Sequence, residues 1–486
     1  MIKQYVKTKV SNFVIRIATD VANSKAREVA EEVAISKARE VAEEVANSKA
    51  REVAEEVANS KAREVAENFQ KDTYIRLEQN NLINIKKFNK LMGISFELSK
   101  RVNFLSSKLF INPWEYYKSK QFGFWFGDFN VTLKGKEPIP NIFCAGLNCV
   151  LSDKPLCFSP NESNLDDVDI LLLWGQSSQE SHINMIYNAL LKQKKILFVE
   201  DGFFYNVISH VKSLQGNYPS NISQGMSFTI DDITAHFDGS LPSRLEQIIN
   251  SDKVIDENEV IRARELIKVI IKNKITKYNY QSIEHKSYGL RMSKVLVVDQ
   301  AYGDYSVYKS GASEEVFGKM LADAISENPD SDILVKIHPD MIVDPNRAGA
   351  KNGGYFGNMQ INHPNVIIIK DEINPYVIIE QVQSIYVCTS QLGFEGLMSS
   401  KKVYCYGVPF YAGWGLTIDR GNKEYLERRI QIRSVEEVFW FAYIWYSKYY
   451  SPLNQKKCEI ENVLDELITS KKNFKIYKLK ESNEME

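Results

Sequence analysis

Ile333-Leu-Val-Lys-Ile-His-Pro339 is a short apolar run that ends in a lysine and a histidine–proline pair. Its aliphatic residues are typical of a buried β-strand, and the proline ends such a strand. In an open α/β sheet, ligands bind in the crevice beyond the carboxyl ends of the strands. We therefore expect Lys336 and His338 to hold an anion such as a phosphate. The alternative is an ordinary strand end, with a solvated lysine and a histidine that packs without a function.

Strand and helix patterns alternate on both sides of this run. Residues 169–175 and 195–202 are predicted strands joined by a helix at 183–193, which makes a βαβ unit. A charged helix at residues 254–274 separates this series from a second one. The strands predicted in the second series are 294–299, 333–338, 365–370, 384–388 and 403–406. The predicted fold is α/β, with two Rossmann-like doubly wound lobes and a central cleft, the arrangement called GT-B.

The pattern also predicts domain boundaries. We expect residues 136–255 to form the N-terminal lobe and residues 288–430 the C-terminal lobe. Residues 256–287 would link the lobes, and helices in residues 431–486 would pack across both of them. Residues 71–135 contain helical and aromatic stretches to which the sequence assigns no function.

A twelve-residue repeat fills residues 21–67 and resembles nothing else in the chain. Alanine, glutamate, lysine and arginine give it a high helix propensity, so residues 1–70 are predicted to form a helical repeat extension. Alanine at every fourth position makes the apolar stripe wind around the helix, which fits a heptad coiled coil poorly. Self-association through residues 21–67 and a solvated spacer both remain open.

Composition limits the class of protein. The 486 residues are 44% hydrophobic and 25% charged, which suits a globular chain of several domains. A formal net charge of −1 gives no broad basic field, so no nucleic-acid partner is expected. The six cysteines lack metal-binding or disulfide spacing, and no metal site is predicted. Neither a leader peptide nor a membrane span is recognisable, so we expect a cytoplasmic protein.

Glu200-Asp-Gly202 ends the strand predicted at residues 195–202. Because glycine lets the backbone turn sharply, one of the two carboxylates can enter the cleft as a general base or a nucleophile. Acidic residues before a glycine are also common in ordinary turns, which is the alternative.

Thr389-Ser-Gln-Leu-Gly-Phe-Glu395 follows another predicted strand and begins a helix. Its hydroxyl and backbone N–H groups are of the kind that binds phosphate at a helix start, and Glu395 is placed to reach a ribose hydroxyl. Helix N-capping by Thr389 or Ser390 explains the same residues without a ligand. Asp330-Ser-Asp332 and His363-Pro364 precede their strands, so we place them at the opposite edge of the sheet, away from the site.

Several motifs, in this order, resemble the capsule-polysaccharide biosynthesis family of KpsC type. They are Glu200-Asp-Gly-Phe203, Val295-Leu-Val-Val-Asp-Gln-Ala-Tyr-Gly-Asp304, Val335-Lys-Ile-His-Pro-Asp340, Thr389-Ser-Gln-Leu-Gly-Phe-Glu-Gly-Leu397 and Gly407-Val-Pro-Phe-Tyr-Ala-Gly-Trp-Gly-Leu-Thr417. The resemblance spans residues 168–468. It implies a retaining β-Kdo transferase of GT-B fold, distantly similar to bacterial sialyltransferases, that transfers Kdo from CMP-β-Kdo to a lipid-linked or glycan acceptor during capsule synthesis.

The resemblance also assigns residues by position. It implies Asp201 as the catalytic carboxylate, with Glu200 and His338 in the catalytic site and His338 facing the CMP phosphate. The residues implied for donor binding are Gln300, Gly303, Lys336, Pro339, Thr389, Ser390, Gln391 and Glu395. No metal or cofactor is implied, since CMP-Kdo is a substrate. The expected partners are CMP-Kdo, the acceptor and other capsule-assembly proteins.

One motif departs from the family pattern. Family members commonly continue the acidic motif as Phe-Leu-Arg-Ser, whereas here Phe203 is followed by Phe204-Tyr-Asn206, so an arginine expected near the sugar or acceptor is missing. A transferase for another CMP-activated acidic sugar, such as sialic acid, and a non-catalytic scaffold of the assembly complex therefore remain alternatives. Peripheral attachment at the inner face of the inner membrane is also left open.

Overall fold

The computed structural model describes the chain mainly from residue 162 onward. The described residues are 162–176, 180–213, 218–344, 354–359 and 361–484, with short pieces at 87, 90–93, 95, 122–125, 149–150 and 157–158. The chain divides into two units, of which the first joins Met1–Lys87 with Tyr187–Gln193. The second unit contains two β-sheets. The helical repeat predicted for residues 1–70 lies outside the described residues.

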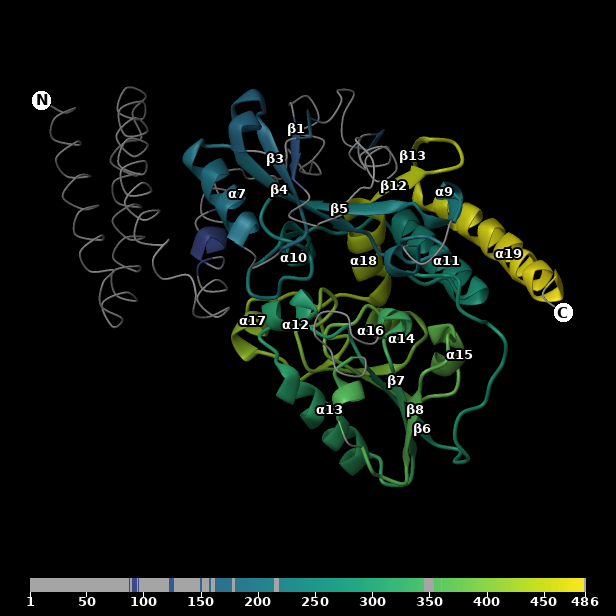
Figure 1. The fold of residues 1–486 in the computed structure, drawn as a ribbon. Helices are drawn as coiled ribbons and strands as arrows, with labels where there is room; N and C mark the ends of the chain where they lie inside the picture. Colours follow the sequence, from purple (N-terminus) through teal and green to yellow (C-terminus); the bar gives the residue numbers. More distant parts are fainter. Residues whose placement is uncertain are drawn as a thin grey trace, which may run out of the picture. The chain divides into compact units, whose positions relative to one another are not determined.

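The first lobe is built on a seven-stranded sheet with the order β13-β12-β5-β4-β3-β1-β2 (Figure 1). Its strands are β1 (Phe122–Trp125), β2 (Cys157–Phe158), β3 (Ile170–Trp174), β4 (Lys195–Asp201), β5 (Ser227–Asp231), β12 (Lys448–Ser451) and β13 (Lys456–Cys458). Strands β1 to β4 are parallel, whereas β5, β12 and β13 pair antiparallel with their neighbours. Strand β3 reads Ile-Leu-Leu-Leu-Trp and is almost wholly buried, as expected for a strand covered on both faces.

The second lobe is built on a six-stranded, wholly parallel sheet with the order β11-β10-β9-β6-β7-β8. Its strands are β6 (Lys294–Val298), β7 (Asp332–Lys336), β8 (Val366–Ile369), β9 (Ser384–Val387), β10 (Lys402–Cys405) and β11 (Ile418–Asp419). The run that begins at Ile333 therefore forms β7, beside the central strand β6. Together the two sheets confirm the predicted α/β fold with two doubly wound lobes.

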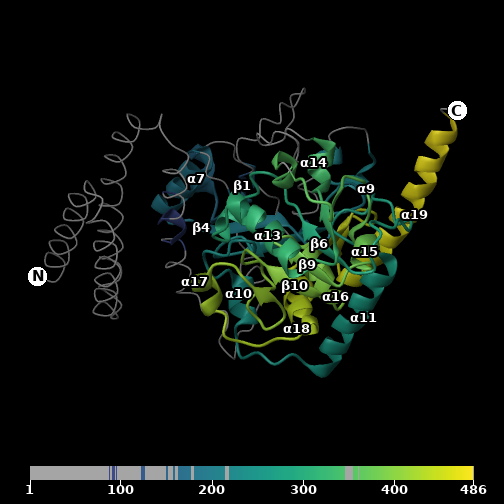
Figure 2. The ribbon, with the colours of Figure 1, turned by 90° about the horizontal axis from the view of Figure 1, so that it is seen from below.

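Helices connect the strands and cover both faces of the second sheet. The helices of the second unit include α8 (His210–Ser213), α9 (Ser220–Ser223), α10 (Arg244–Ile249), α11 (Glu257–Asn273), α12 (Tyr305–Lys309), α13 (Glu314–Glu327), α14 (Pro339–Val343), α15 (Pro375–Ile379), α16 (Leu392–Met398) and α17 (Lys423–Glu427). Alternate residues of β6 enter different cores, since Val295 packs with Phe317 of α13 and Leu296 with Phe394 of α16. The two helices thus lie on opposite faces of the sheet (Figure 2).

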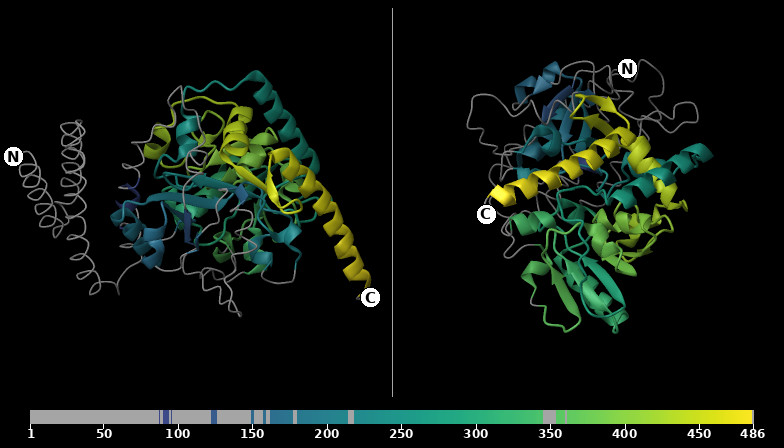
Figure 3. Two further views of the ribbon diagram at one scale, coloured as in Figure 1. Left: turned by 90° about the horizontal axis from the view of Figure 1, so that it is seen from above. Right: turned by 90° about the vertical axis from the view of Figure 1, so that its right-hand side faces the viewer.

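The C-terminal region joins the two lobes. Helix α18 (Val435–Phe439) continues into the π-helix η4 (Trp440–Tyr446). The buried Tyr443 ring lies 4.4 Å from the Phe203 ring of the first lobe and 5.7 Å from the Phe394 ring of the second, measured between centroids. Helix α19 (Ile460–Glu484) then runs beside α11 (Figure 3).

One expectation for residues 431–486 was wrong, because this region is not only helical. Residues Lys448–Ser451 and Lys456–Cys458 form β12 and β13, which extend the first-lobe sheet. Tyr449 and Tyr450 are both buried there, and tyrosine favours strands when it packs on a sheet. The aromatic composition of this stretch fits either structure, and pairing with β5 selects the strand.

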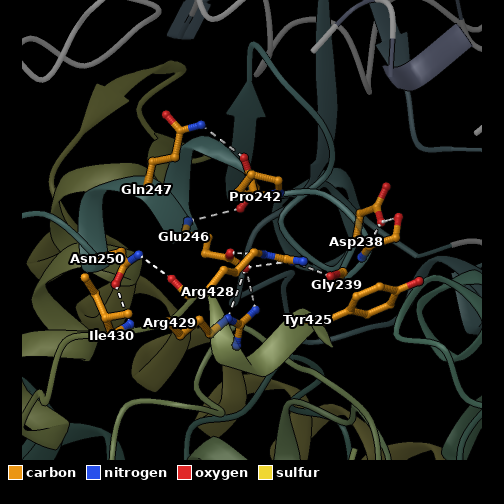
Figure 4. A network of polar contacts seen from close by, with 12 residues as sticks. Asp238, Gly239, Pro242, Glu246, Gln247, Asn250, Tyr425, Arg428, Arg429 and Ile430 are labelled. Carbon is orange, nitrogen blue, oxygen red and sulfur yellow. Dashed lines mark hydrogen bonds and ion pairs between the residues drawn. The ribbon is translucent and has the colours of Figure 1, made fainter. Parts of the chain in front are cut away.

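Buried ion pairs connect helix α10 of the first lobe with the segment after α17 of the second (Figure 4). Glu246 accepts hydrogen bonds from Arg429 Nε at 3.0 Å and Nη2 at 2.8 Å, and from Arg428 Nε at 2.5 Å. A second buried pair joins Lys309 of α12 to Asp238 of the first lobe at 3.0 Å. Because all these charges are paired, this network spans the junction of the lobes and leaves none of its own charged groups free for a ligand.

Candidate active site

Asp201 ends strand β4, and the chain turns away immediately after it. Gly202 N–H donates to the Ser227 carbonyl oxygen of the neighbouring strand β5 at 2.8 Å. A Cβ atom on residue 202 would lie 2.2 Å from Ser227 Oγ and 2.9 Å from the Ser227 carbonyl carbon, so only glycine fits. The glycine of the acidic motif is therefore explained by close packing, which leaves Asp201 at the carboxyl end of its strand.

The two carboxyl groups of the motif differ in their pKa values. Burial raises the pKa of Asp201 to about 6, and the positive charge of Lys277 opposes this rise. Burial and the neighbouring Asp201 raise the pKa of Glu200 to about 8. Asp201 Oδ1 is buried without a hydrogen-bond partner among the described residues. At neutral pH the site therefore contains an ionised Asp201 beside a protonated Glu200.

His338 lies on the second lobe, as the N-cap of helix α14. Its Nδ1 accepts a hydrogen bond from the Asp340 backbone N–H at 3.2 Å, and Pro339 occupies the first helical position. Burial lowers the pKa of His338, so the ring is neutral at pH 7. Because Nδ1 is an acceptor, the proton of the neutral ring is on Nε2, which is then available as a hydrogen-bond donor.

Lys336 and Glu395 bring two further buried groups to the same side of the second sheet. Lys336 Nζ and Glu395 Oε2 have no hydrogen-bond partner in the part of the chain that the structure describes. Burial lowers the pKa of Lys336 to about 8 and raises that of Glu395 to about 7. Buried polar atoms are nearly always satisfied, so these two atoms are candidates for contact with a polar ligand.

Gln300 and Thr389 are bonded to each other across the ends of β6 and β9. Thr389 N–H donates to Gln300 Oε1 at 2.8 Å, and Gln300 Nε2 donates to Thr389 Oγ1 at 2.9 Å and to Asp304 Oδ2 at 3.1 Å. Gly303, in the turn before Asp304, has a φ of +75°, which explains a glycine there. This pairing holds the turn against the second-lobe strands.

The start of helix α16 differs from the expectation. The helix begins at Leu392, and its N-cap is Gln391, not Thr389 or Ser390. The prediction of free backbone N–H groups is wrong at two positions. The Thr389 N–H is bonded to Gln300 Oε1, and the Leu392 N–H is bonded to Ser390 Oγ. Local side chains satisfy these donors, so a phosphate would have to rely on other groups.

Gln391 reaches across to the first lobe. Its Nε2 donates to the Phe203 carbonyl oxygen at 2.8 Å, two residues after Asp201. Ser209 Oγ of the first lobe donates to Asp340 Oδ1 at 3.1 Å, next to Pro339. Gln391 thus contacts the loop that follows Asp201, and its Nε2 is already hydrogen-bonded.

Two charged residues outside the predicted set connect the acidic pair with His338. Lys277 acts on the pKa of Asp201, of Glu200 and of His338, and Asp304 acts on those of Glu200 and His338. The acidic pair and the histidine therefore lie in electrostatic range of the same two side chains. Sequence reasoning missed both as site residues, although Asp304 ends a motif that resembles the family and Lys277 lies within the residues that the resemblance spans.

Neither a metal cluster nor a membrane helix is found in the ranges described. In those residues no group of three or more histidine, cysteine, aspartate or glutamate side chains is arranged to bind a metal ion. None of the helices described is both long and apolar enough to cross a membrane.

Comparison with known proteins shows to which family this chain is related. Residues 169–449 match the family described as capsule polysaccharide biosynthesis protein. The chain belongs to this family. All predicted site residues of this capsule-biosynthesis chain, from Glu200 to Glu395, lie inside the matched part.

Curated relatives of the capsule-biosynthesis chain include two bacterial proteins. The capsule polysaccharide modification protein LipA of Neisseria meningitidis serogroup A is 32% identical over 288 residues, which are 58% of this chain and 38% of LipA. The lipopolysaccharide-processing protein LpsZ of Rhizobium meliloti is 30% identical over 62% of this chain and 64% of its own length. The chain thus matches less than two thirds of the length of either relative.

A solved structure supports the fold of this family member. The β-Kdo 2,4 transferase of KpsC from Thermosulfurimonas dismutans has 30% sequence identity and a TM-score of 0.60, covering 72% of this chain and 98% of the other. The predicted GT-B arrangement and the KpsC-type resemblance are thereby confirmed. The similarity also supports a glycosyltransferase role in capsule biosynthesis.

Proposed function

We propose that this chain is a glycosyltransferase that takes Kdo from CMP-β-Kdo, transfers it to a lipid-linked or glycan acceptor, and retains the anomeric configuration. The observation that carries the proposal is the buried Asp201 Oδ1, which has no hydrogen-bond partner among the residues described, while Asp201 and the neutral His338 share Lys277 as a charged neighbour. Retaining transfer from a nucleotide sugar requires a nucleophile and a hydrogen-bond donor to the departing phosphate, and here the two lobes supply one each.

In the first step, Asp201 Oδ attacks the anomeric carbon while the bond from this carbon to the CMP phosphate oxygen breaks. The departing phosphate takes the electron pair, and His338 Nε2–H and the Lys336 ammonium stabilise its charge. The product of this step is a sugar covalently bound to Asp201. Two such displacements, each with inversion, give overall retention.

In the second step, the acceptor hydroxyl attacks the same carbon and displaces Asp201. Its proton needs a base, and we assign this role to Glu200. The charge of Asp201 is one cause of the raised Glu200 pKa. Once Asp201 carries the sugar as a neutral ester, this repulsion is gone and the pKa of Glu200 falls, so Glu200 releases its own proton to solvent and its carboxylate then accepts the proton of the acceptor hydroxyl.

The proposal is tested by incubating the purified chain with an acceptor and either CMP-Kdo or CMP-sialic acid. We expect CMP release and a product heavier by one or more Kdo residues with the first donor, and no transfer with the second. The anomeric configuration of the product, determined by NMR, should match that of CMP-β-Kdo. Preferential transfer of sialic acid would indicate the other donor, and no CMP release from either donor would indicate a scaffold.

The activity should depend on pH with a maximum between the pKa values of Asp201, about 6, and Glu200, about 8. Below this range Asp201 is protonated and cannot attack. Above it, Glu200 adds a negative charge beside Asp201 and Lys336, with a pKa of about 8, loses its positive charge, so the anionic donor binds less well. Values of kcat/KM measured across this range should give a bell-shaped profile.

Circular dichroism at each pH serves as the control for this profile. Because the carboxyl pKa values are raised in the folded state, these groups make the folded state less stable as the pH rises and more stable as it falls. Unfolding is therefore not the expected cause of a loss of activity near pH 6. An acid limb centred at the ordinary aspartate pKa of about 4 would contradict the assignment of Asp201.

A further inference from the structure

The segment from Ile275 to Gln281 runs from α11 past the loop that follows Asp201. Tyr205 N–H donates to the Lys277 carbonyl oxygen at 3.0 Å, and Asn279 N–H donates to the Val207 carbonyl oxygen at 2.9 Å. Asn206 and Tyr278 form a parallel bridge between these bonds. The backbone of Lys277 is thus hydrogen-bonded to the first lobe at Tyr205, three residues after the acidic motif.

The same segment is attached to the second lobe. Thr276 Oγ1 donates to Glu395 Oε1 of helix α16. Asn279 Oδ1 accepts from the Thr276 backbone N–H at 3.0 Å, and Asn279 Nδ2 donates to the Asn206 carbonyl oxygen at 3.1 Å. Lys277 therefore stands between the two lobes on a backbone that is held from both sides.

The side chain of Lys277 is half-buried, and its ammonium has no hydrogen bond or ion pair within the described ranges. The contact shown for its ammonium is with the Tyr278 ring, 5.9 Å from the ring centroid. Lys309, also at the junction of the lobes, is by contrast paired with Asp238 at 3.0 Å. Lys277 thus carries a positive charge that forms no ion pair within the described ranges and lies in electrostatic range of the acidic pair and His338.

We infer that Lys277 binds the carboxylate that a ulosonic acid donor carries on its anomeric carbon, and so selects this class of sugar. The inference rests on the proposed function. In Kdo and in sialic acids, the anomeric carbon bears both the phosphate that leaves and a carboxylate. If Asp201 approaches this carbon from one side and the phosphate leaves towards His338, the carboxylate lies between them, where the backbone places Lys277.

The charge balance of the reaction gives a physical reason for this cation. An attacking carboxylate must approach a carbon that already carries a carboxylate, and like charges at contact distance repel strongly in a closed site. An ordinary aldose has a hydrogen atom at that place and needs no such compensation. Lys277 offsets the repulsion for an acidic sugar, and for a neutral sugar it would remain half-buried without an ion-pair partner.

The test compares Lys277→Met, Lys277→Arg and Lys272→Met, the last as a matched control on the exposed side of α11. Lys277→Met should bind CMP, which lacks the sugar carboxylate, as tightly as the wild type in calorimetry. Its kcat/KM for CMP-Kdo should fall by about 100-fold, the usual effect of removing one charge-stabilising group. Lys277→Arg should restore most of this loss, and Lys272→Met should behave as the wild type.

Three results would overturn the inference. Wild-type kcat/KM in Lys277→Met would show that no essential anion contacts this side chain. Equal losses in CMP affinity and in CMP-Kdo turnover would place the phosphate, not the carboxylate, at Lys277. A wild-type chain that releases no CMP from CMP-Kdo would refute the proposed function itself, and the carboxylate assignment with it.

Discussion

Replacing Asp201 by asparagine is expected to abolish sugar transfer, with a fall in kcat of about 10⁴-fold or more. An amide of the same shape cannot act as the nucleophile. The neighbouring carboxyl group at the end of β4, that of Glu200, cannot replace it because it is protonated at neutral pH. The measurement is CMP release from CMP-Kdo under saturating donor and acceptor. Mass spectrometry of the wild type with donor alone should in addition detect a sugar adduct that the variant lacks.

The same substitution should leave the fold intact or stabilise it. The pKa of Asp201 is about 6 in the folded chain, above its ordinary value, so the stability that its proton provides is lost as the pH rises through 6. Asparagine stays neutral, and at pH 8 it should raise the free energy of unfolding by up to about 3 kcal/mol. Asp252→Asn, at an exposed carboxyl, is the control and should change neither property. Full activity in Asp201→Asn would refute the catalytic assignment.

The second large effect concerns stability. Replacing Glu246 by glutamine is expected to lower the free energy of unfolding by about 3–5 kcal/mol, because it leaves two guanidinium groups facing a neutral partner. Loss of the ion pair with Arg429 accounts for the larger part of this decrease, because the Arg429 side chain is only 3% exposed. Its other hydrogen bonds are to the neutral carbonyl oxygens of Pro409 and Ala412. Urea denaturation followed by circular dichroism measures the difference.

The control for this prediction is Glu265→Gln on helix α11. Glu265 also forms an ion pair, with Lys268 at 2.7 Å, but both side chains are more than 60% exposed. Such surface pairs contribute at most about 1 kcal/mol. If Glu246→Gln were no more destabilising than Glu265→Gln, the buried pairs between the lobes would not contribute to stability.

The sequence alone predicts the strands of the second lobe well, because their signal is local. Ile333, Leu334 and Val335 belong to an uninterrupted aliphatic run, which is what a strand buried on both faces requires. The places of Asp201 and His338 follow from runs of this kind, since Asp201 ends β4 and His338 lies two residues after the end of β7. Chain order and strand ends were therefore sufficient to locate both residues.

Contacts between distant parts of the chain could not be predicted in this way. Gln300 is 89 positions from Thr389, whose N–H it occupies, and Gln391 is 188 positions from Phe203. Lys277 lies within the residues that the family resemblance spans, but its own sequence neighbours do not distinguish it from a solvated linker lysine. Its position depends on contacts of its segment with the loop after Asp201 and with helix α16, which come together only in the folded chain, and a single sequence does not record such contacts.

The position of Tyr443 between Phe203 and Phe394 limits how this architecture can be recombined in evolution. Each lobe contributes a ring to one continuous apolar core, together with α18 and η4. A gene fusion that imported a foreign second lobe would have to bring a matching C-terminal segment as well. Changes in specificity should therefore arise by substitutions around Asp201 and His338, while the two halves are inherited together.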